Sequence, residues 1–441
     1  MNLQDVCAIG TFTEFMTPPV QSECGLPAAH RMWRMARIAG FVVAGAACAG
    51  AVTQSPGQSS SGRASTPLRE TVPASVATLR DSVRALLDQA RADSAFPGAV
   101  AVVGNRDSVL VEYGVGSLDW TPSPRPDENT LWDMASLTKV VGLTTAMMQL
   151  SEAGKVDLDA PVQRYVEEFQ GPNKERVTVR HLLTHSSGLP AWRPLYKETE
   201  SPAAARALAV ATALDTLPGI RMVYSDLGAI ILGIVVERVS GETLDGYLAR
   251  HVFEPLRMTS TMYRPGRDLL PRIAPTEYDP WRQRHIRGEV HDENAFALGG
   301  VSGHAGLFST GHDVARLCRM YLNGGMLDGV RMVSGETIRR FTTVQDSTFS
   351  NRALGWETPN GTNSAGHLLT RPAFGHTGFT GTSIWVDPSR DLFVILLTNR
   401  VNPTRQNLRI GKVRTALADV VVRVLDRAVA PSPSPSPSSP R

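Results

Sequence analysis

The apolar positions of the chain follow a helix-then-hairpin pattern from residue 77 onward. Residues 77–94 place apolar side chains at helical spacing, which predicts an amphipathic helix. Two runs rich in β-branched residues follow at 98–103 and 108–113, and the polar triplet Asn-Arg-Asp between them is typical of a turn. The pattern therefore predicts a helix followed by a β-hairpin.

The strand pattern returns near the other end of the chain. Residues 382–386 and 392–397 predict a second hairpin, and residues 404–425 predict a final helix. Between the two hairpins the apolar spacing is mostly helical, with candidate helices at 137–153, 202–214, 225–239, 244–252 and 311–323. We therefore expect an α/β (α+β) fold: an antiparallel sheet built from both ends of the domain, flanked by helices, with an all-helical region inserted.

Residues 1–52 have the pattern of a leader that ends in a secretory signal peptide. Basic residues precede an uncharged run of about 15 residues from Ile38 to Val52, shorter than the roughly 20 that a spanning helix needs. An uncleaved membrane anchor and a buried helix are the alternatives. Cys48 follows small residues in a weak lipobox, so lipidation is a further route to a membrane tether. The pattern predicts export to the periplasm or cell envelope.

Amino-acid composition predicts the remaining domain boundaries. Residues 53–75 are rich in Ser, Pro, Gly and Thr, which predicts a flexible linker, and residues 429–441 form a Pro-Ser tail that cannot bury a core. This leaves 76–428 as one domain, long enough for a large hydrophobic core. If the leader is removed, Cys318 is the one cysteine left, and no internal disulfide can form.

Charge and composition exclude several classes of protein. The 441 residues include 45 Lys+Arg and 42 Asp+Glu, with 42% hydrophobic and 20% charged residues, as in an ordinary globular chain. A net charge of +3 gives no reason to expect nucleic-acid binding. Only five of the basic residues are lysines. Because Arg cannot be deprotonated, a lysine retained in so Arg-rich a chain is a candidate for acid–base chemistry.

One of these lysines, Lys139, follows Ser136 by three residues where a helix is predicted to begin. Three residues is about one helical turn, so both side chains share a face. A Ser at a helix N-terminus beside a Lys can act as a nucleophile, because the Lys can accept its proton or stabilise a neighbouring anion. A capped surface helix would show the same spacing, so this motif alone is weak.

Two further motifs follow along the chain. Tyr224 and Asp226 flank a serine at the start of an apolar helix, where a helix cap is the simpler interpretation and a proton shuttle for Ser136 the functional one. His376-Thr377-Gly378 lies on or just before a predicted strand, and glycines there let a substrate approach the strand edge.

The three motifs in this order resemble those of the serine β-lactamase and penicillin-binding-protein superfamily. The chain is most similar to the branch that holds class C β-lactamases, serine DD-peptidases and related esterases. Other segments carry the same resemblance: HLLTHSSGLP (181–190), YSDLGAIILG (224–233), ALGGVSGHAGLFST (297–310) and FGHTGFTGTSIWVDP (374–388). The likeness covers about residues 80–400.

The resemblance implies a mechanism and a fold. Ser136 would form an acyl-enzyme, and Lys139 and Tyr224 would handle its proton and that of the leaving group. The backbone N–H groups of Ser136 and Phe379 would hold the oxyanion, and Asp226, His376, Thr377 and Gly378 would contact the substrate. The family implies a β-lactamase/transpeptidase-like fold with no metal or cofactor, and a small-molecule or peptidoglycan-peptide substrate.

The chain departs from its relatives at two of these positions. The second motif usually ends in Asn, whose amide can donate to a substrate carbonyl, whereas an ionised Asp226 can only accept. Asp226 would favour a charged Lys139 or a charged His376 if it lay near either. Many β-lactamases have Lys where this chain has His376, which is only partly charged near neutral pH.

These departures favour a D-alanyl-D-alanine carboxypeptidase-like or esterase-like hydrolase over a dedicated β-lactamase. A penicillin-binding sensor or non-catalytic binding domain is the alternative from another class, although Ser136, Lys139 and Tyr224 are all present. A zinc site at His181 and His185 is disfavoured, because no Glu lies between them. The loop at 291–293 and the turn holding Ser302 and His304 carry no function on sequence alone.

Overall fold

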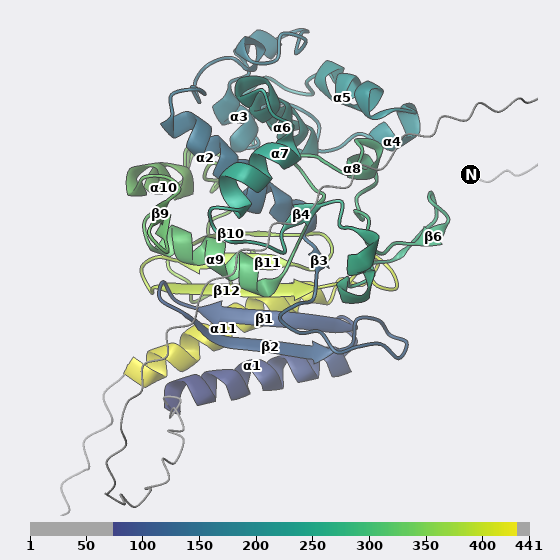
Figure 1. Cartoon of the computed structure of the whole chain (residues 1–441). Coiled ribbons are helices and arrows are strands. Elements are labelled where there is room, and N and C mark those ends of the chain that lie inside the picture. The colour runs from purple at the N-terminus through teal and green to yellow at the C-terminus, as the bar shows by residue number, and fades with distance from the viewer. Residues whose placement is uncertain (1–73, 430–441) are drawn as a thin grey trace, which may run out of the picture. The chain divides into compact units, whose positions relative to one another are not determined.

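A five-stranded antiparallel sheet unites the two ends of residues 74–429, the part of the chain that the computed structural model describes (Figure 1). Its strand order is β10-β11-β12-β1-β2, with β1 Gly98–Gly104, β2 Val109–Gly116, β10 Phe374–Thr377, β11 Ser383–Asp387 and β12 Leu392–Thr398. Strand β12 pairs with β1, so the two predicted hairpins form one continuous sheet. This confirms the expected fold class.

Helices cover both faces of this sheet (Figure 1). Successive side chains along a strand point to opposite faces, so alternate residues pack against different helices. Ala99 and Ala101 of β1 share one hydrophobic cluster with α1 (Ala74–Ala92) and α11 (Ile410–Val429). Val100 and Val102 point to the opposite face and share a second cluster with α9, Gly311–Leu322. The sheet is therefore buried on both sides, which is why every position of β1 and β12 is buried and all but the terminal Thr398 are non-polar.

The segment between β2 and β10 holds the helical region, which packs beyond α9 (Figure 1). Its longest helix is α6, Asp226–Ser240, in which ten consecutive positions from Leu227 to Val236 are buried. Besides α9 and the 3₁₀ turn η1, Ala135–Leu137, the other helices and helical turns between β2 and β10 are η2 Lys139–Leu143 (a π-helical turn), α2 Thr144–Glu152, η3 Val162–Arg164, η4 Lys174–Arg176, α3 Val179–Leu183, α4 Leu195–Glu198, α5 Pro202–Ala211, α7 Leu244–Leu248, η5 Ala249–Phe253, η6 Arg267–Arg272, α8 Glu293–Ala297 and α10 Gly335–Thr342.

Short strands connect the sheet to the helical region. A small antiparallel sheet has the order β3-β7-β4, and its edge strand β3 leads directly into the 3₁₀ turn η1, Ala135–Leu137, which carries Ser136. The short strands are β3 Trp132–Asp133, β4 Met262–Tyr263, β5 Tyr278–Asp279, β6 Arg284–His285, β7 Leu307–Ser309, β8 Met326–Leu327 and β9 Val330–Arg331.

Two predicted helices differ from the structure in ways that matter for the site. The helix expected over 137–153 is divided into η1, the π-helical turn η2 and α2. The last helix begins at Ile410 instead of residue 404, because Arg400 donates to the carbonyl oxygens of Arg405 and Asn407 and holds that stretch as a loop. Among residues 74–429, no helix is both long and apolar enough to cross a membrane.

The predicted leader 1–52, with Cys48, lies outside the described residues. So do residues 53–73 of the predicted linker and residues 430–441 of the predicted tail. These borders, and the domain over 76–428, stay predictions. Within 74–429, Cys318 is a free, buried thiol.

Candidate active site

Ser136 lies on a strained turn held by a buried carboxylate. Ala135, immediately before it, has φ +46°, a left-handed conformation that costs a non-glycine residue about 1–2 kcal/mol. Asp133 offsets this cost, since its Oδ1 accepts the Ala135 N–H at 2.8 Å and its Oδ2 accepts the His291 N–H at 2.6 Å. The turn thereby leaves the Ser136 side chain partly exposed while its neighbours Ala135 and Leu137 are buried.

The segment after His376 packs directly against this turn. The hydroxyl groups of Thr380 and Thr382 donate to the carbonyl oxygens of Asp133 and Met134, at 2.7 and 3.1 Å. Gly378 makes the closest approach, because a Cβ atom there would lie 2.1 Å from Thr382 Oγ1 and 2.6 Å from the Met134 oxygen. The third motif is thus brought to the first one by contacts that only a glycine at 378 permits.

Lys139 is buried, and all three of its N–H donors have acceptors. Its Nζ lies 3.0 Å from Ser136 Oγ, 3.0 Å from the carbonyl oxygen of His304 and 2.7 Å from Asp226 Oδ1. Burial disfavours the charged form, but the Asp226 carboxylate outweighs it, so the pKa of Lys139 lies above its ordinary value. Lys139 is therefore an ammonium group.

Tyr224 and Asp226 reach the site because Ser225 caps helix α6. The Ser225 hydroxyl accepts the Gly228 N–H, so the residues on either side of it emerge at the helix N-terminus. The Tyr224 hydroxyl is buried without a hydrogen-bond partner in residues 74–429, and Lys139 Nζ lies 5.0 Å from the Tyr224 ring centroid. Burial raises the pKa of Tyr224, and the charge of Lys139 opposes that rise.

His376 is a neutral, buried ring. Its Nδ1 contacts the Thr377 carbonyl oxygen at 2.8 Å, which assigns the ring proton to Nδ1, while Nε2 is buried without a partner in the described chain. Burial, then the charges of Arg352 and Lys139, hold the pKa of His376 well below its usual range. Of the two groups that Asp226 was expected to favour in charged form, it pairs with Lys139, and His376 stays uncharged.

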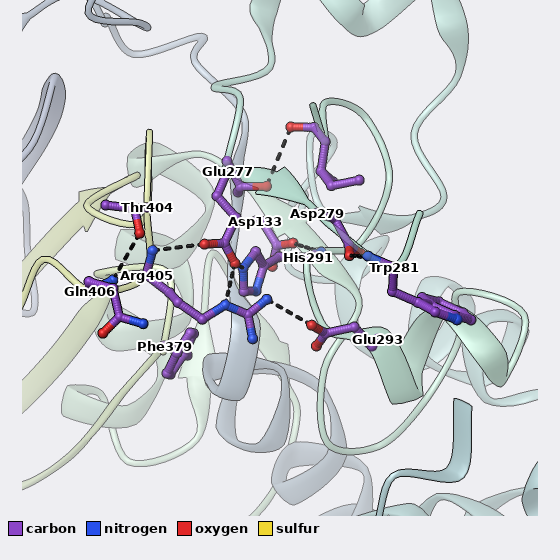
Figure 2. Close-up of polar contacts among 12 residues, drawn as sticks. Asp133, Glu277, Asp279, Trp281, His291, Glu293, Phe379, Thr404, Arg405 and Gln406 are labelled. Carbon is purple, nitrogen blue, oxygen red and sulfur yellow. Dashed lines mark hydrogen bonds and ion pairs between the residues drawn. The ribbon is translucent and has the colours of Figure 1, made fainter. Parts of the chain in front are cut away.

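Phe379 directly follows the third motif and lies near His291 and Arg405 (Figure 2). The residue is 49% exposed, its ring stacks on His291 with ring centroids 5.6 Å apart, and its carbonyl oxygen accepts from Arg400 Nε at 2.9 Å. Within the described chain, neither the Phe379 N–H nor the Ser136 N–H has an acceptor. Two unpaired backbone donors beside a serine hydroxyl are what an oxyanion site requires.

The structure thus brings the predicted residues into two groups that meet at Ser136. Lys139, Tyr224 and Asp226 approach from the helical region, and residues 376–379 approach from the edge of the sheet. The arrangement can deliver a serine oxygen to a carbonyl carbon.

A family model described as "Beta-lactamase" matches residues 83–418 of the chain. The chain belongs to the beta-lactamase family. The family and the fold together indicate a serine hydrolase of the β-lactamase or penicillin-binding-protein type.

Curated relatives of this beta-lactamase-family chain carry a narrower name. It is 32% identical over 349 residues to a protein of Escherichia coli O157:H7 named "Putative D-alanyl-D-alanine carboxypeptidase", covering 70% of this chain and 79% of the relative. It is 35% identical over 305 residues to a protein of the same name from Escherichia coli K12, covering 62% of this chain and 69% of the relative.

Solved structures support the fold of this beta-lactamase-family chain. A penicillin-binding protein homologue from Caulobacter crescentus superimposes with a TM-score of 0.65 at 20% identity, covering 80% of this chain and 98% of that one. A class C β-lactamase superimposes with a TM-score of 0.64 at 20% identity, covering 79% and 99%.

Sequence reasoning missed the residues that surround Tyr224. Arg352 places its guanidinium carbon 5.2 Å from the Tyr224 ring centroid while it pairs with Glu357 at 2.7 Å. The His185 ring lies 4.6 Å from the same ring, and its Nδ1 accepts the Ser225 N–H. Arg352 lies in no motif, so nothing in the sequence pointed to it. His185 was considered only as a metal ligand, and residues 74–429 hold no cluster of three groups suited to a metal.

A charged cluster behind Phe379 was also missed (Figure 2). Glu277 lies 2.7 Å from His291 Nε2 and 2.5 Å from Arg405 Nε, and Arg405 also pairs with Glu293 at 2.7 Å. The cluster fixes the ring on which Phe379 stacks. In the sequence, only the polar run at 291–293 indicated this cluster. Its partners Glu277 and Arg405 lie in segments with no recognisable motif.

Proposed function

We propose that the protein is an exported serine hydrolase that acts through a Ser136 acyl-enzyme on amide or ester substrates. Its activity is of the D-Ala-D-Ala carboxypeptidase or esterase type. The observation that carries the proposal is the position of Ser136 Oγ, 3.0 Å from Lys139 Nζ and beside the two unpaired N–H groups of Ser136 and Phe379. The relatives named carboxypeptidases support the same assignment.

In this proposal Tyr224 is the proton acceptor and Lys139 is its electrostatic partner. Lys139 is charged and its donors are all engaged, so the base is the Tyr224 phenolate, which the ammonium favours. The Ser136 O–H bond breaks, its proton passes to the Tyr224 oxygen, and Oγ bonds to the substrate carbonyl carbon. Tyr224 then returns the proton to the leaving group. Water repeats the sequence to release the acid and restore Ser136.

This ionisation state has a consequence for pH. Burial raises the pKa of Tyr224, so the phenolate is a minor form of the free enzyme at neutral pH. We therefore expect kcat/KM to rise as pH increases through the neutral range, until Lys139 begins to lose its proton.

The side chains around Ser136 support the preference against a dedicated β-lactamase. Asp226 offers a carboxylate where an amide donor would assist a β-lactam side chain, and neutral His376 supplies no charge for a β-lactam carboxylate. We propose a small-molecule or peptidoglycan-peptide substrate, met outside the cytoplasm after export through residues 1–52, with Cys48 lipidation or the N-terminal segment as a possible tether.

A substrate panel tests the proposal. Wild type, Ser136→Ala and Ser389→Ala are compared on nitrocefin, a D-Ala-D-Ala peptide and p-nitrophenyl esters, and each is labelled with a fluorescent penicillin. Ser389 lies exposed in the β11–β12 turn and controls for loss of a hydroxyl. We expect hydrolysis of the peptide or an ester, abolished by Ser136→Ala alone.

Each other outcome has a distinct meaning. Stable penicillin label without turnover of any substrate indicates a sensor, and rapid nitrocefin hydrolysis indicates a β-lactamase. Labelling or hydrolysis that survives Ser136→Ala shows that the nucleophile is wrong.

A further inference from the structure

A hydrogen-bonded Ser-His-Asp triplet, buried at Ser302 and His304 and 26% exposed at Asp292, lies beside the site and is not used by the mechanism above. Ser302 Oγ is 2.7 Å from His304 Nδ1, and His304 Nε2 is 2.8 Å from Asp292 Oδ1. His304 is 1% exposed, and Ser302 is also buried. The hydrogen bonds assign the protons: Nε2 faces a carboxylate and donates to it, so in the neutral ring Nδ1 accepts from the Ser302 hydroxyl.

Ser302, His304 and Asp292 do not form a second nucleophilic site. The cavity beside Ser302, lined in part by Gly233, Leu298 and Gly303, has a volume of about 10 Å³. That is the space of a single water molecule, too small for an acyl group. Its role has to be sought in what its members hold.

The backbone of His304 connects the Ser302-His304-Asp292 triplet to Lys139. Its carbonyl oxygen accepts from Lys139 Nζ at 3.0 Å, one of the three bonds that saturate the ammonium. The preceding residue, Gly303, packs on α6 so closely that a Cβ atom would lie 2.3 Å from the Ala229 oxygen. Asp292 is fixed as well, because its Oδ1 accepts the Ala295 N–H at 2.7 Å as the cap of α8.

We propose that Asp292, His304 and Ser302 form a positioning relay for Lys139. The two side-chain bonds of His304 fix the plane of its peptide, and thereby aim its carbonyl oxygen at the lysine. Without the relay, Lys139 keeps Asp226 and Ser136 but loses a fixed third acceptor, so its ammonium drifts from Ser136 Oγ. The catalytic consequence rests on the proposed function, whereas the effect on Lys139 does not.

The test has a readout that needs no activity. Because the chain has only five lysines, [¹⁵N]lysine labelling gives few Nζ signals, and Lys139→Arg assigns the one of interest. The Nζ signal of Lys139 is followed against pH in wild type, His304→Ala and Asp292→Asn. Loss of an acceptor disfavours the charged form, so His304→Ala is expected to move the Lys139 titration to lower pH. Asp292→Asn keeps an acceptor oxygen for Nε2 and is expected to move it less.

Catalysis provides the second readout, and another His–Asp pair provides the control. In His304→Ala we expect acylation by the fluorescent penicillin, or by an active ester, to slow by about 10–100-fold, as when a supporting hydrogen bond is removed from a site. His367 pairs with Asp419 at 3.0 Å near α11, and His367→Ala should change neither the titration nor the rate.

The outcomes separate the two proposals. An unchanged Lys139 titration in folded His304→Ala overturns the relay, even if activity falls. A shifted titration supports it. If wild type acylates no probe but the titration still shifts, the relay stands and the proposed function fails.

Discussion

Replacing Asp226 by Asn tests whether the Lys139–Asp226 ion pair stabilises the fold. The two charged groups approach to 2.7 Å, Lys139 is 3% exposed and Asp226 is 20% exposed. At about 4 Å between charge centres and an effective dielectric constant of about 20, their attraction is about 4 kcal/mol. Asn keeps an acceptor oxygen, and Ser136 and His304 still hold the ammonium. We therefore expect Asp226→Asn to lower the free energy of unfolding by about 2–3 kcal/mol.

The sign of the pH dependence follows from Lys139. Its pKa is raised in the folded state, so its contribution to stability is complete below the pKa of an unfolded lysine, about 10.4, and is lost as pH rises through the folded value. The difference between wild type and Asp226→Asn should therefore be constant from pH 6 to 9 and shrink at more alkaline pH.

Urea unfolding at pH 7.5 measures the effect, with a surface ion pair as the control. Asp159 pairs with Arg180 at 2.6 Å but is 63% exposed, so Asp159→Asn should cost only about 0.2–1 kcal/mol. A loss of less than 1 kcal/mol in Asp226→Asn, or a loss equal to that of the control, would show that the buried pair contributes no more than a solvated one.

Two further changes, and a second assay of Asp226→Asn, test other properties of the site. Gly378→Ala should displace the Phe379 N–H and reduce acylation by about 10²–10³-fold, whereas Gly411→Ala, where a Cβ atom meets nothing within 4 Å, should not; stopped-flow labelling compares them. By NMR, His376 should titrate at lower pH than a free histidine, and Arg352→Gln, which removes a charge that lowers the pKa of His376, should raise that pKa; an unchanged His376 titration would contradict the electrostatic assignment. Because the depressed pKa of His376 favours proton uptake by the unfolded chain, stability should fall as pH drops below about 6.5. Asp226→Asn restores an amide donor, so its turnover of a cephalosporin should exceed that of wild type in a steady-state assay.

The sheet could be predicted from sequence because its signal is local. The strands around residues 98–113 and 382–398 alternate or run apolar over whole lengths, and polar turns mark their ends. The break of the 137–153 helix into η1, η2 and α2 could not be predicted. The turn that carries η1 is held by Asp133, Thr380 and Thr382, and the two threonines are too distant in the sequence for the local apolar spacing to indicate them.

The site shows the same division. Ser136, Lys139, Tyr224 and the third motif were found because their order and types carry chemistry. Their supporting residues were not, since Arg352 and Arg405 act through partners far away in the sequence. His304 was noticed only as part of a glycine-rich turn. The atom of His304 that contacts Lys139 is the backbone carbonyl oxygen, and a pattern of side chains does not predict the direction of a carbonyl group.

The packing of residues 378–382 against the Ser136 turn also sets an order of assembly. Ser136 is synthesised some 240 residues before the threonines that brace its turn, and strand β1 must wait for β12 to complete its pairing. Contacts of such long sequence separation form late and slowly. A chain still emerging from the ribosome therefore has Ser136 but lacks the residues that brace its turn. The hydrolase becomes competent only after nearly the whole domain has been released and can close on itself.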